Sequence, residues 1–393
     1  MGRGTIVSAP NSQAKAWARR DAVLKDSAWP SPPFRVGINR RDFVSTVAAG
    51  LGTIFVCRFP RGADDVFVER WSWAMGQPVH VMVFAGSEQE GLDGCAAALA
   101  ELRRVEARLT LFDDASDLCE LNRRAGRTAM RVDEDLRVVL ARARHFKRVT
   151  GGAFDVAVEP LMRAWGFHRP RRSAPTTPEI AEAREAVLTA VVDLEGDVVR
   201  LPNAHTQLDF GSIGVGYGID RALGVLSARG IRRALVDVSG DVAASGAPPG
   251  EAGWLVGIAD PDRPGEGAIV AQTLLEHAAL ATAANTVSVV RYGTLVAGHV
   301  MNPVTGWPAN ALRQATVVTR DAVAADALST AMLVSGRAPE GVLRSYAVHG
   351  PMGSCPIPPA PAPASAPARA AAGPLSTRCS SRPGSSRSAF PGS

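Results

Sequence analysis

The sequence lacks the residues that would form a disulfide framework or a cysteine-based metal site. Its 393 residues include five cysteines, at positions 57, 95, 119, 355 and 379. No two of them have the C-x-x-C spacing of a zinc or thioredoxin-like site, and an odd, scattered set does not define a disulfide framework. Any metal centre in this protein must therefore be built from oxygen or nitrogen ligands.

The body of the chain also lacks positive charge. The formal net charge is +5 at pH 7, but residues 1–63 carry +7 and residues 341–393 carry +5. The stretch 64–340 between them has 28 basic and 35 acidic residues. An acidic body repels phosphate chains, so nucleic acid is excluded as a partner.

The two ends of the sequence differ from the middle. Residues 39–44 (NRRDFV) and the short apolar run up to Val56 are typical of a twin-arginine signal, which predicts export to the periplasm. The alternative is a buried helix with a chance arginine pair in a cytoplasmic protein. Residues 349–393 are rich in Pro, Ala, Ser and Arg, which predicts a disordered tail. A shifted reading frame in a GC-rich gene yields the same composition. The globular part is then 64–348.

Within that part, periodicity predicts both strands and helices. Residues 75–85 alternate as a half-buried strand does, and 88–109 repeat apolar side chains at helical spacing. A second helix is expected at 133–149, ending at a glycine pair. Beyond about residue 191, strand and helix signals alternate up to residue 334.

Residues 151–167 (GGAFDVAVEPLMRAWGF) combine a glycine pair with a carboxylate. The glycines permit a tight turn, and Ala153 and Phe154 place an apolar face beside Asp155. Alone, this pattern is more typical of core packing than of a ligand site.

Residues 208–246 predict a short strand, a glycine-rich turn, a helix and a second strand. Gly211, Gly214 and Gly216 follow G-x-x-G-x-G, which does not match the Rossmann pattern. Backbone N–H groups at the helix start could bind phosphate. Alternatively, the glycines only permit close helix packing. Residues 239–241 (SGD) close the second strand as a turn.

Residues 298–309 (GHVMNPVTGWPA) contain a turn signal, in which Asn302 precedes proline and Gly306 tolerates left-handed geometry. This turn is expected to hold His299 at the end of a strand. A lone histidine is more often structural than catalytic, but its near-neutral pKa suits a general base.

Residues 321–336 (DAVAADALSTAMLVSG) are expected to form a helix. Asp326, Ser329 and Thr330 stand at i, i+3 and i+4 and so share one side of it. One carboxylate with hydroxyls suits Mg²⁺, which completes its octahedron with water and substrate phosphate. Solvent-exposed polar residues at helical spacing are the competing interpretation.

Taken in order, these segments resemble the ApbE family of FAD:protein FMN transferases, from about Trp71 to Gly336. The resemblance rests on G-G-A-F-D, L-D-x-G-x-I-x-x-G-Y, S-G-D, H-x-x-N-P-x-T-G and A-D-A-L-x-T-A. It implies an α+β fold, in which a single catalytic domain of mixed sheets flanked by helices lies between disordered extensions.

The resemblance also implies roles for individual residues. Contacts to FAD are implied for Met75, Ala153, Phe154, Asp155, Asp209, Val215 and Met301. Magnesium ligands are implied for Ser212, Asp326, Ser329 and Thr330. His299 matches the family histidine beside the flavin, and we expect His299 and Asp326 to be catalytic.

The implied reaction is Mg²⁺-dependent transfer of FMN from FAD to a threonine hydroxyl of an acceptor redox protein, with release of AMP. The acceptor would carry a D-G-x-T-like motif and would be membrane-associated or exported. Two alternatives are an FAD pyrophosphatase that gives FMN and AMP, and a flavin-binding protein that has lost catalysis.

Three departures from the family bear on activity. Val215 stands where members usually carry Lys or Glu, and Ala283-Ala284 replace the usual Ser-Gly. The third is at the C-terminal end, where we expect the helix and strand that close the family's sheet to be missing and an edge of the sheet to be open.

Overall fold

The computed structural model describes residues 44–47, 53–57, 65–263, 267–286 and 288–349. The arginine pair of the expected signal and the Pro/Ala/Ser/Arg tail lie outside these residues. The apolar run after the arginine pair contains strands β1 (Val44–Val47) and β2 (Thr53–Cys57). The alternative prediction of a buried helix there is therefore wrong.

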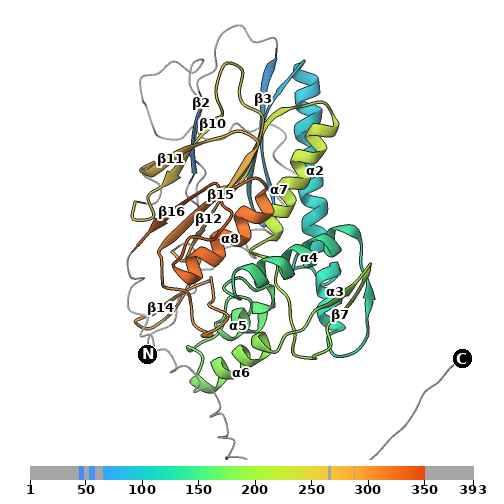
Figure 1. The fold of residues 1–393 in the computed structure, drawn as a ribbon, viewed down its shortest axis with the longest axis vertical. Coiled ribbons are helices and arrows are strands. Elements are labelled where there is room, and N and C mark those ends of the chain that lie inside the picture. Colours follow the sequence, from blue (N-terminus) through green and yellow to red (C-terminus); the bar gives the residue numbers. More distant parts are fainter. Residues whose placement is uncertain (1–43, 48–52, 58–64, 264–266, 287, 350–393) are drawn as a thin grey trace, which may run out of the picture. The chain divides into compact units, whose positions relative to one another are not determined.

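A seven-stranded sheet forms the centre, in the order β16-β15-β12-β9-β8-β4-β3 (Figure 1). Every neighbouring pair in it is antiparallel. The strands are β3 (Val66–Ala74), β4 (Gln77–Ala85), β8 (Arg233–Val238), β9 (Asp241–Ser245), β12 (Ala278–Ala284), β15 (Gln314–Thr319) and β16 (Arg344–Val348).

Strand β16 corrects the expectation of an open edge. Residues 344–348 pair with β15, from Arg344 opposite Val318 to Val348 opposite Gln314. These backbone hydrogen bonds cover the edge of β15 that a missing strand would have exposed. β16 is thus the edge strand of the sheet on this side, and β15 is paired along both of its sides.

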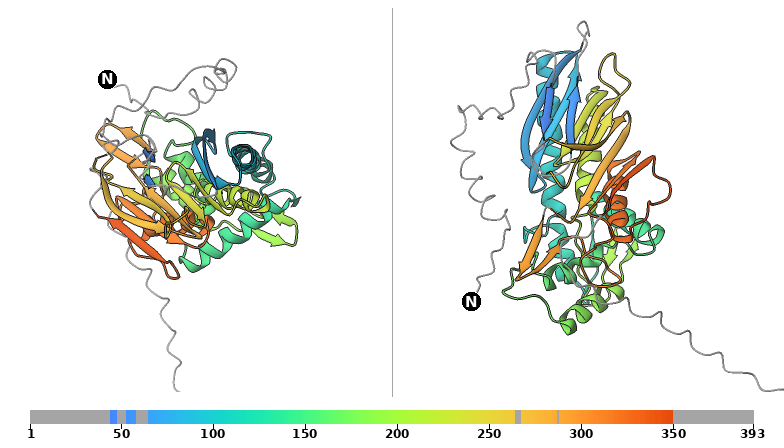
Figure 2. Two further views of the ribbon diagram at one scale, coloured as in Figure 1. Left: turned by 90° about the horizontal axis from the view of Figure 1, so that it is seen from above. Right: turned by 90° about the vertical axis from the view of Figure 1, so that its left-hand side faces the viewer.

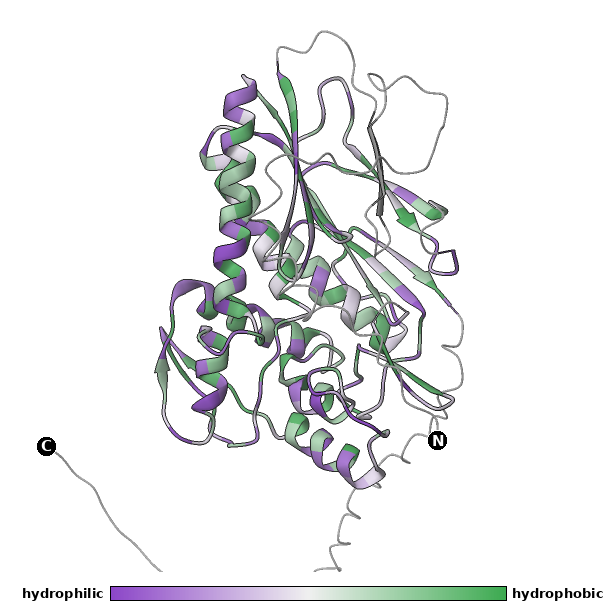
Figure 3. Ribbon diagram, turned by 180° about the vertical axis from the view of Figure 1, so that it is seen from behind, coloured by the Kyte–Doolittle hydropathy of each residue, from purple (hydrophilic) through white to green (hydrophobic). Residues whose placement is uncertain are grey.

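Three helices cover one face of this sheet: α2 (Glu88–Leu109), α7 (Gly214–Ala228) and α8 (Ala322–Ser335). Apolar side chains of α2 and α7, such as Leu102 and Ile219, are buried against strand residues such as Val81. Hydrophobic and hydrophilic residues alternate along α2, the long helix of Figure 3, as expected for a helix with one buried side.

A smaller sheet covers the other face, in the order β1-β2-β10-β11. Its strands β10 (Trp254–Ala259) and β11 (Ile269–Leu275) are antiparallel. Trp254 and Ile258 pack with Met82 and Leu235 of the central sheet. The upper part of the molecule is therefore built in layers of helix, sheet and sheet, as the turned views show (Figure 2).

The remaining elements lie beyond the lower end of α2 (Figure 1). They include α3 (Asp117–Arg123), α4 (Glu134–Val149), α5 (Glu159–Ala164), α6 (Thr177–Leu188), the short strands β5 (Met130–Arg131), β6 (Asp193–Glu195) and β7 (Val198–Arg200), and the hairpin β13 (Val289–Tyr292) and β14 (Leu295–Gly298). The helices predicted at 88–109 and 133–149 are confirmed by α2 and α4. No described helix is long and apolar enough to cross a membrane.

The strand expected at the start of residues 208–246 does not form. Residues 206–210 pair with no strand. Asn122 instead bonds both backbone groups of Leu208, its Oδ1 accepting at 2.8 Å and its Nδ2 donating at 2.9 Å. A side chain thus takes over the partners that a neighbouring strand would supply, and the segment runs on into α7.

Gly216 brings α7 into direct contact with α8. A Cβ at this position would lie 2.3 Å from the carbonyl oxygen of Ala322. We expect Gly216→Ala to lower the free energy of unfolding by about 1–3 kcal/mol, because the two helices would have to separate. Urea unfolding measures this.

Gly224, on the exposed side of the same helix, supplies the control. A Cβ there meets nothing within 4 Å, so Gly224→Ala is expected to raise the free energy of unfolding by up to about 1 kcal/mol. If both variants were equally stable, the contact between α7 and α8 would not be the reason for glycine at 216.

Candidate functional site

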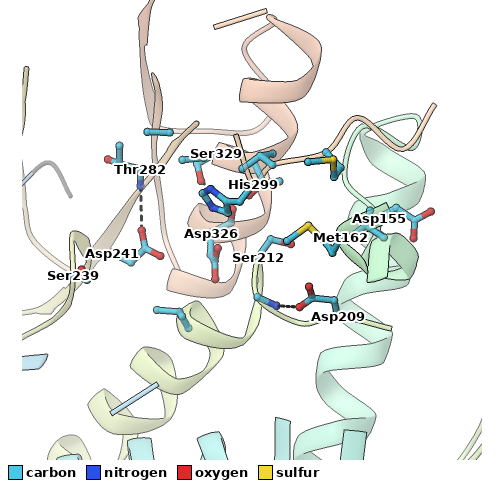
Figure 4. A pocket seen from close by; sticks show the side chains of 18 of the residues that line it. Asp155, Met162, Asp209, Ser212, Ser239, Asp241, Thr282, His299, Asp326 and Ser329 are labelled. Atoms are coloured by element: carbon cyan, nitrogen blue, oxygen red, sulfur yellow. Dashed lines mark hydrogen bonds between the residues drawn. The ribbon is translucent and has the colours of Figure 1, made fainter. Parts of the chain in front are cut away.

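A pocket opens where the start of β9 and the end of β12 meet the start of α7 and the middle of α8 (Figure 4). Its empty space, including the part that opens to solvent, is about 970 Å³. Its lining is drawn from segments far apart in the sequence. The predicted site residues in it are Ala153, Asp155, Asp209, Ser212, Val215, His299, Met301, Asp326, Ser329 and Thr330.

Two carboxylates, the half-buried Asp241 and the buried Asp326, lie on one side of the pocket (Figure 4). Asp241 accepts a hydrogen bond from the backbone of Thr282 at 3.1 Å, and Asp326 accepts one from the backbone of Gly216 at 3.0 Å. Within the described part of the chain, neither has a basic partner at ion-pair distance. Burial raises the pKa of both, and the charge of Asp241 raises that of Asp326 further.

This side of the pocket fits a divalent cation. Two uncompensated acids in a buried site are costly unless a positive charge joins them. The hydroxyl-bearing residues Ser212, Ser329 and Thr330 line the same space. Among the described residues no group of three His, Cys, Asp or Glu side chains is arranged to hold a metal ion, so hydroxyl, carbonyl and water oxygens would complete the shell. Such an oxygen-only set is what Mg²⁺ prefers.

The buried acids make the stability of the metal-free protein fall as pH rises. Burial raises the pKa of Asp220 to about 6 and those of Asp237 and Asp241 to about 7, from 3.8. Between about pH 4 and pH 7 the folded state therefore binds more protons than the unfolded state. The free energy of unfolding then decreases with rising pH across this window.

We accordingly expect the melting temperature in EDTA to be lower at pH 8 than at pH 5. Added Mg²⁺ should raise it more at pH 8, above the pKa of Asp241, than at pH 5. Asp237→Asn, which removes one of the raised groups, should flatten the profile. Thermal unfolding followed by circular dichroism measures all three, and a melting temperature that rises in EDTA between pH 5 and 7 would contradict the argument.

The opposite side of the pocket carries two acids that do have basic partners. Asp155 lies 2.7 Å from Nζ of Lys147, and Asp209 lies 3.4 Å from Nε2 of His168. Backbone N–H groups also hold them: Ala157 donates to Asp155 at 2.9 Å and Gly211 to Asp209 at 2.7 Å. These carboxylates are oriented acceptors rather than cation ligands.

His299 follows β14 directly, as the sequence predicts, at the start of a rigid turn. The side chain of Asn302 accepts hydrogen bonds from the backbone of Val304 and Thr305, and Gly306 has φ +77°. Burial lowers the pKa of His299, with the Ser288 backbone and Asp209 acting in the other direction. The lowered pKa keeps the ring neutral at pH 7 and able to take a proton. Among the described residues, its buried Nδ1 has no hydrogen-bond partner.

Two of the predicted FAD contacts are outside the pocket lining. Phe154 is fully buried in the core, where its ring meets Phe146 edge-on at 6.1 Å. Met75 occupies the tight turn between β3 and β4 at φ +57°, and its side chain packs against α2 and α7. In this structure both residues support the walls of the site.

Several lining residues are not predicted from the sequence, among them Asp241, Thr282 and Met162. Asp241 closes the turn that the sequence predicts, in which Ser239 and Gly240 have φ +54° and +107°. The signal that could have identified it is an acid directly after a turn that ends a buried strand. The departures Val215 and Ala283-Ala284 also line the pocket.

The sequence of this chain is similar to that of a known protein family. Residues 75–346 match the model of the ApbE family. An FAD:protein FMN transferase of Treponema pallidum is 31% identical over 260 residues, 61% of this chain and 72% of its own. The FAD:protein FMN transferase of Haemophilus influenzae is 28% identical over 245 residues, which cover 60% of this chain and 71% of the relative.

Solved structures agree. The ApbE protein of Thermotoga maritima superposes with a TM-score of 0.62 at 27% identity, covering 68% of this chain and 87% of its own. The flavinyl transferase ApbE of Pseudomonas stutzeri, in its apo form, superposes with a TM-score of 0.60 at 25% identity, covering 69% of this chain and 85% of its own.

Proposed function

This chain belongs to the ApbE family, and we propose that it is a Mg²⁺-dependent FAD:protein FMN transferase acting on a threonine of an exported or membrane-associated redox protein. The observation that carries the magnesium dependence is the pair of uncompensated carboxylates, the half-buried Asp241 and the buried Asp326, beside three hydroxyl-bearing residues. A pocket of this kind can bind a pyrophosphate only when a cation offsets the summed negative charge.

Asp326, Thr330 and the Ser212 backbone would hold the ion, with Ser329 beside it. When bound, Mg²⁺ neutralises charge on the phosphoryl oxygens in the transition state. Asp155 and Asp209, held by their own partners, would accept hydrogen bonds from the nucleotide on the other side of the pocket.

The acceptor hydroxyl would attack the phosphorus of the FMN half, forming a new oxygen–phosphorus bond while the bond to AMP breaks. His299, which lines the pocket, would take the hydroxyl proton. The AMP phosphate leaves with the electron pair of the broken bond. In the absence of an acceptor, water attacking the same phosphorus would give FMN and AMP.

The test mixes the purified chain with FAD, Mg²⁺ and an acceptor domain that bears a threonine motif. Flavin fluorescence in the denatured acceptor band together with AMP release, both abolished by EDTA, is the expected result. Free FMN and AMP without a labelled acceptor would favour a pyrophosphatase. Bound FAD without AMP would mean that the chain only binds flavin.

We also propose export through the motif at residues 39–44, which is supported by Arg40-Arg41 followed by an aromatic residue and an apolar run. Fusing residues 1–63 to a reporter that is active only after export tests this. Arg40→Lys with Arg41→Lys should then retain the reporter in the cytoplasm. Equal export of both fusions would contradict the proposal.

A further inference from the structure

His168 lies behind the pocket, between two acids that belong to different segments. Its Nδ1 is 3.7 Å from Oε1 of Glu159, and its Nε2 is 3.4 Å from Oδ2 of Asp209. The histidine side chain is 15% exposed, and those of Glu159 and Asp209 are 8% and 13% exposed. Each ring nitrogen thus lies within ion-pair distance of one carboxylate, and the two acids together stabilise the imidazolium over the neutral ring.

Asp209 is the member of this group that lines the pocket. Its backbone N–H donates to Val156 at 2.7 Å, and its Oδ1 accepts from Gly211 at 2.7 Å. Its other oxygen faces His168. The direction in which this carboxylate meets a ligand therefore depends on the charge state of the histidine behind it.

The groups around His168 favour its charged form. Glu159 and Arg163 face it from α5, and Asp209 faces it from the segment before α7, while Phe112 packs edge-on against the ring at 5.9 Å. Burial alone lowers the pKa of His168, and Arg163 acts in the same direction. Glu159 and Asp209 outweigh both, so the pKa lies above 6.5.

We propose that His168 is a positioning residue for FAD. As the imidazolium it holds the Asp209 carboxylate in the orientation that accepts hydrogen bonds from hydroxyl or amino groups of the nucleotide. This inference rests on the proposed function. Its consequence is that FAD affinity falls as pH rises through the pKa of His168, because a neutral ring can donate to only one of the two acids.

The test measures the dissociation constant for FAD from pH 6 to pH 9, with saturating Mg²⁺ and without acceptor. The wild type is expected to weaken by about threefold to tenfold across this range, the effect of one charge-assisted contact. His168→Gln, which donates one hydrogen bond and carries no charge, should bind about tenfold more weakly at pH 6.5 and lose this slope. The slope that other groups contribute is common to both proteins and cancels in their comparison.

Two further variants separate positioning from packing. Glu159→Gln should move the midpoint of the pH profile to lower pH, because His168 loses one of its two acids. A packing role would leave that midpoint unchanged. His205→Gln is the matched control, since this histidine is exposed and hydrogen-bonds the Thr189 hydroxyl at 3.0 Å, and its profile should equal that of the wild type.

Equal slopes in the wild type and His168→Gln, or an unmoved midpoint in Glu159→Gln, would overturn the assignment while leaving FMN transfer intact. A wild type that binds no FAD at any pH would overturn the proposed function and this inference with it. Thermal unfolding of each variant establishes that it is folded before its affinity is compared.

Discussion

Replacing Asp326 by asparagine is expected to lower the rate of FMN transfer by about a hundredfold to a thousandfold. The variant removes one of two buried charges on the cation side of the pocket. Asparagine keeps an oxygen that can accept from the Gly216 backbone, which the carboxylate bonds at 3.0 Å, so the contact between α7 and α8 should persist. Single-turnover labelling of an acceptor domain at saturating FAD and Mg²⁺ measures the loss.

Asp93→Asn is the control for this variant. Asp93 is exposed on α2 and accepts a hydrogen bond from the Gln89 side chain, so its loss should leave the rate within about twofold of the wild type, as for most surface substitutions. An Asp326→Asn protein that is folded and transfers FMN at the wild-type rate would show that the buried pair does not hold the catalytic cation.

His299→Ala is expected to slow transfer by about a hundredfold to ten-thousandfold while changing the dissociation constant for FAD by about threefold at most. The burial that lowers the pKa of His299 keeps the ring neutral at pH 7, the form that a base requires. The substitution removes that base but none of the acids that face the nucleotide. Single-turnover rates and fluorescence titration with FAD separate the two effects.

His205→Ala serves as the comparison, because His205 lies on the surface and away from the pocket lining. Its rate and affinity should match those of the wild type. Should His299→Ala lose FAD affinity and transfer to the same degree, the histidine would be a binding residue, and the base would have to be sought among the carboxylates.

Local patterns in the sequence were sufficient for the parts of the site that are contiguous in the chain. Asp326, Ser329 and Thr330 share one side of α8 because of helical spacing, and the turn after His299 follows from Asn302 and Gly306. These signals depend on a few neighbouring residues. The structure places all three helix residues and the histidine in one pocket.

The features that the sequence does not predict depend on contacts between segments that are distant in the chain. Asp241 reaches the pocket only because β9 lies beside β12, and nothing near residue 241 indicates which strand will pair with it. Phe154 stands next to a pocket acid but turns into the core. Strand β16 is five residues long. A segment this short shows no periodic pattern that would distinguish it from the C-terminal sequence that follows.

The central sheet also sets the order in which the chain can fold. Strand β4 pairs with β8, where Val79 lies opposite Val238. Residues 86–232 separate these two strands in the sequence. Pairing that joins positions so far apart requires the loss of much chain entropy before any hydrogen bond forms, which slows folding. The hairpin of β3 and β4 can form early. The pocket, which needs β9, β12 and both flanking helices in place, can only be completed at the end.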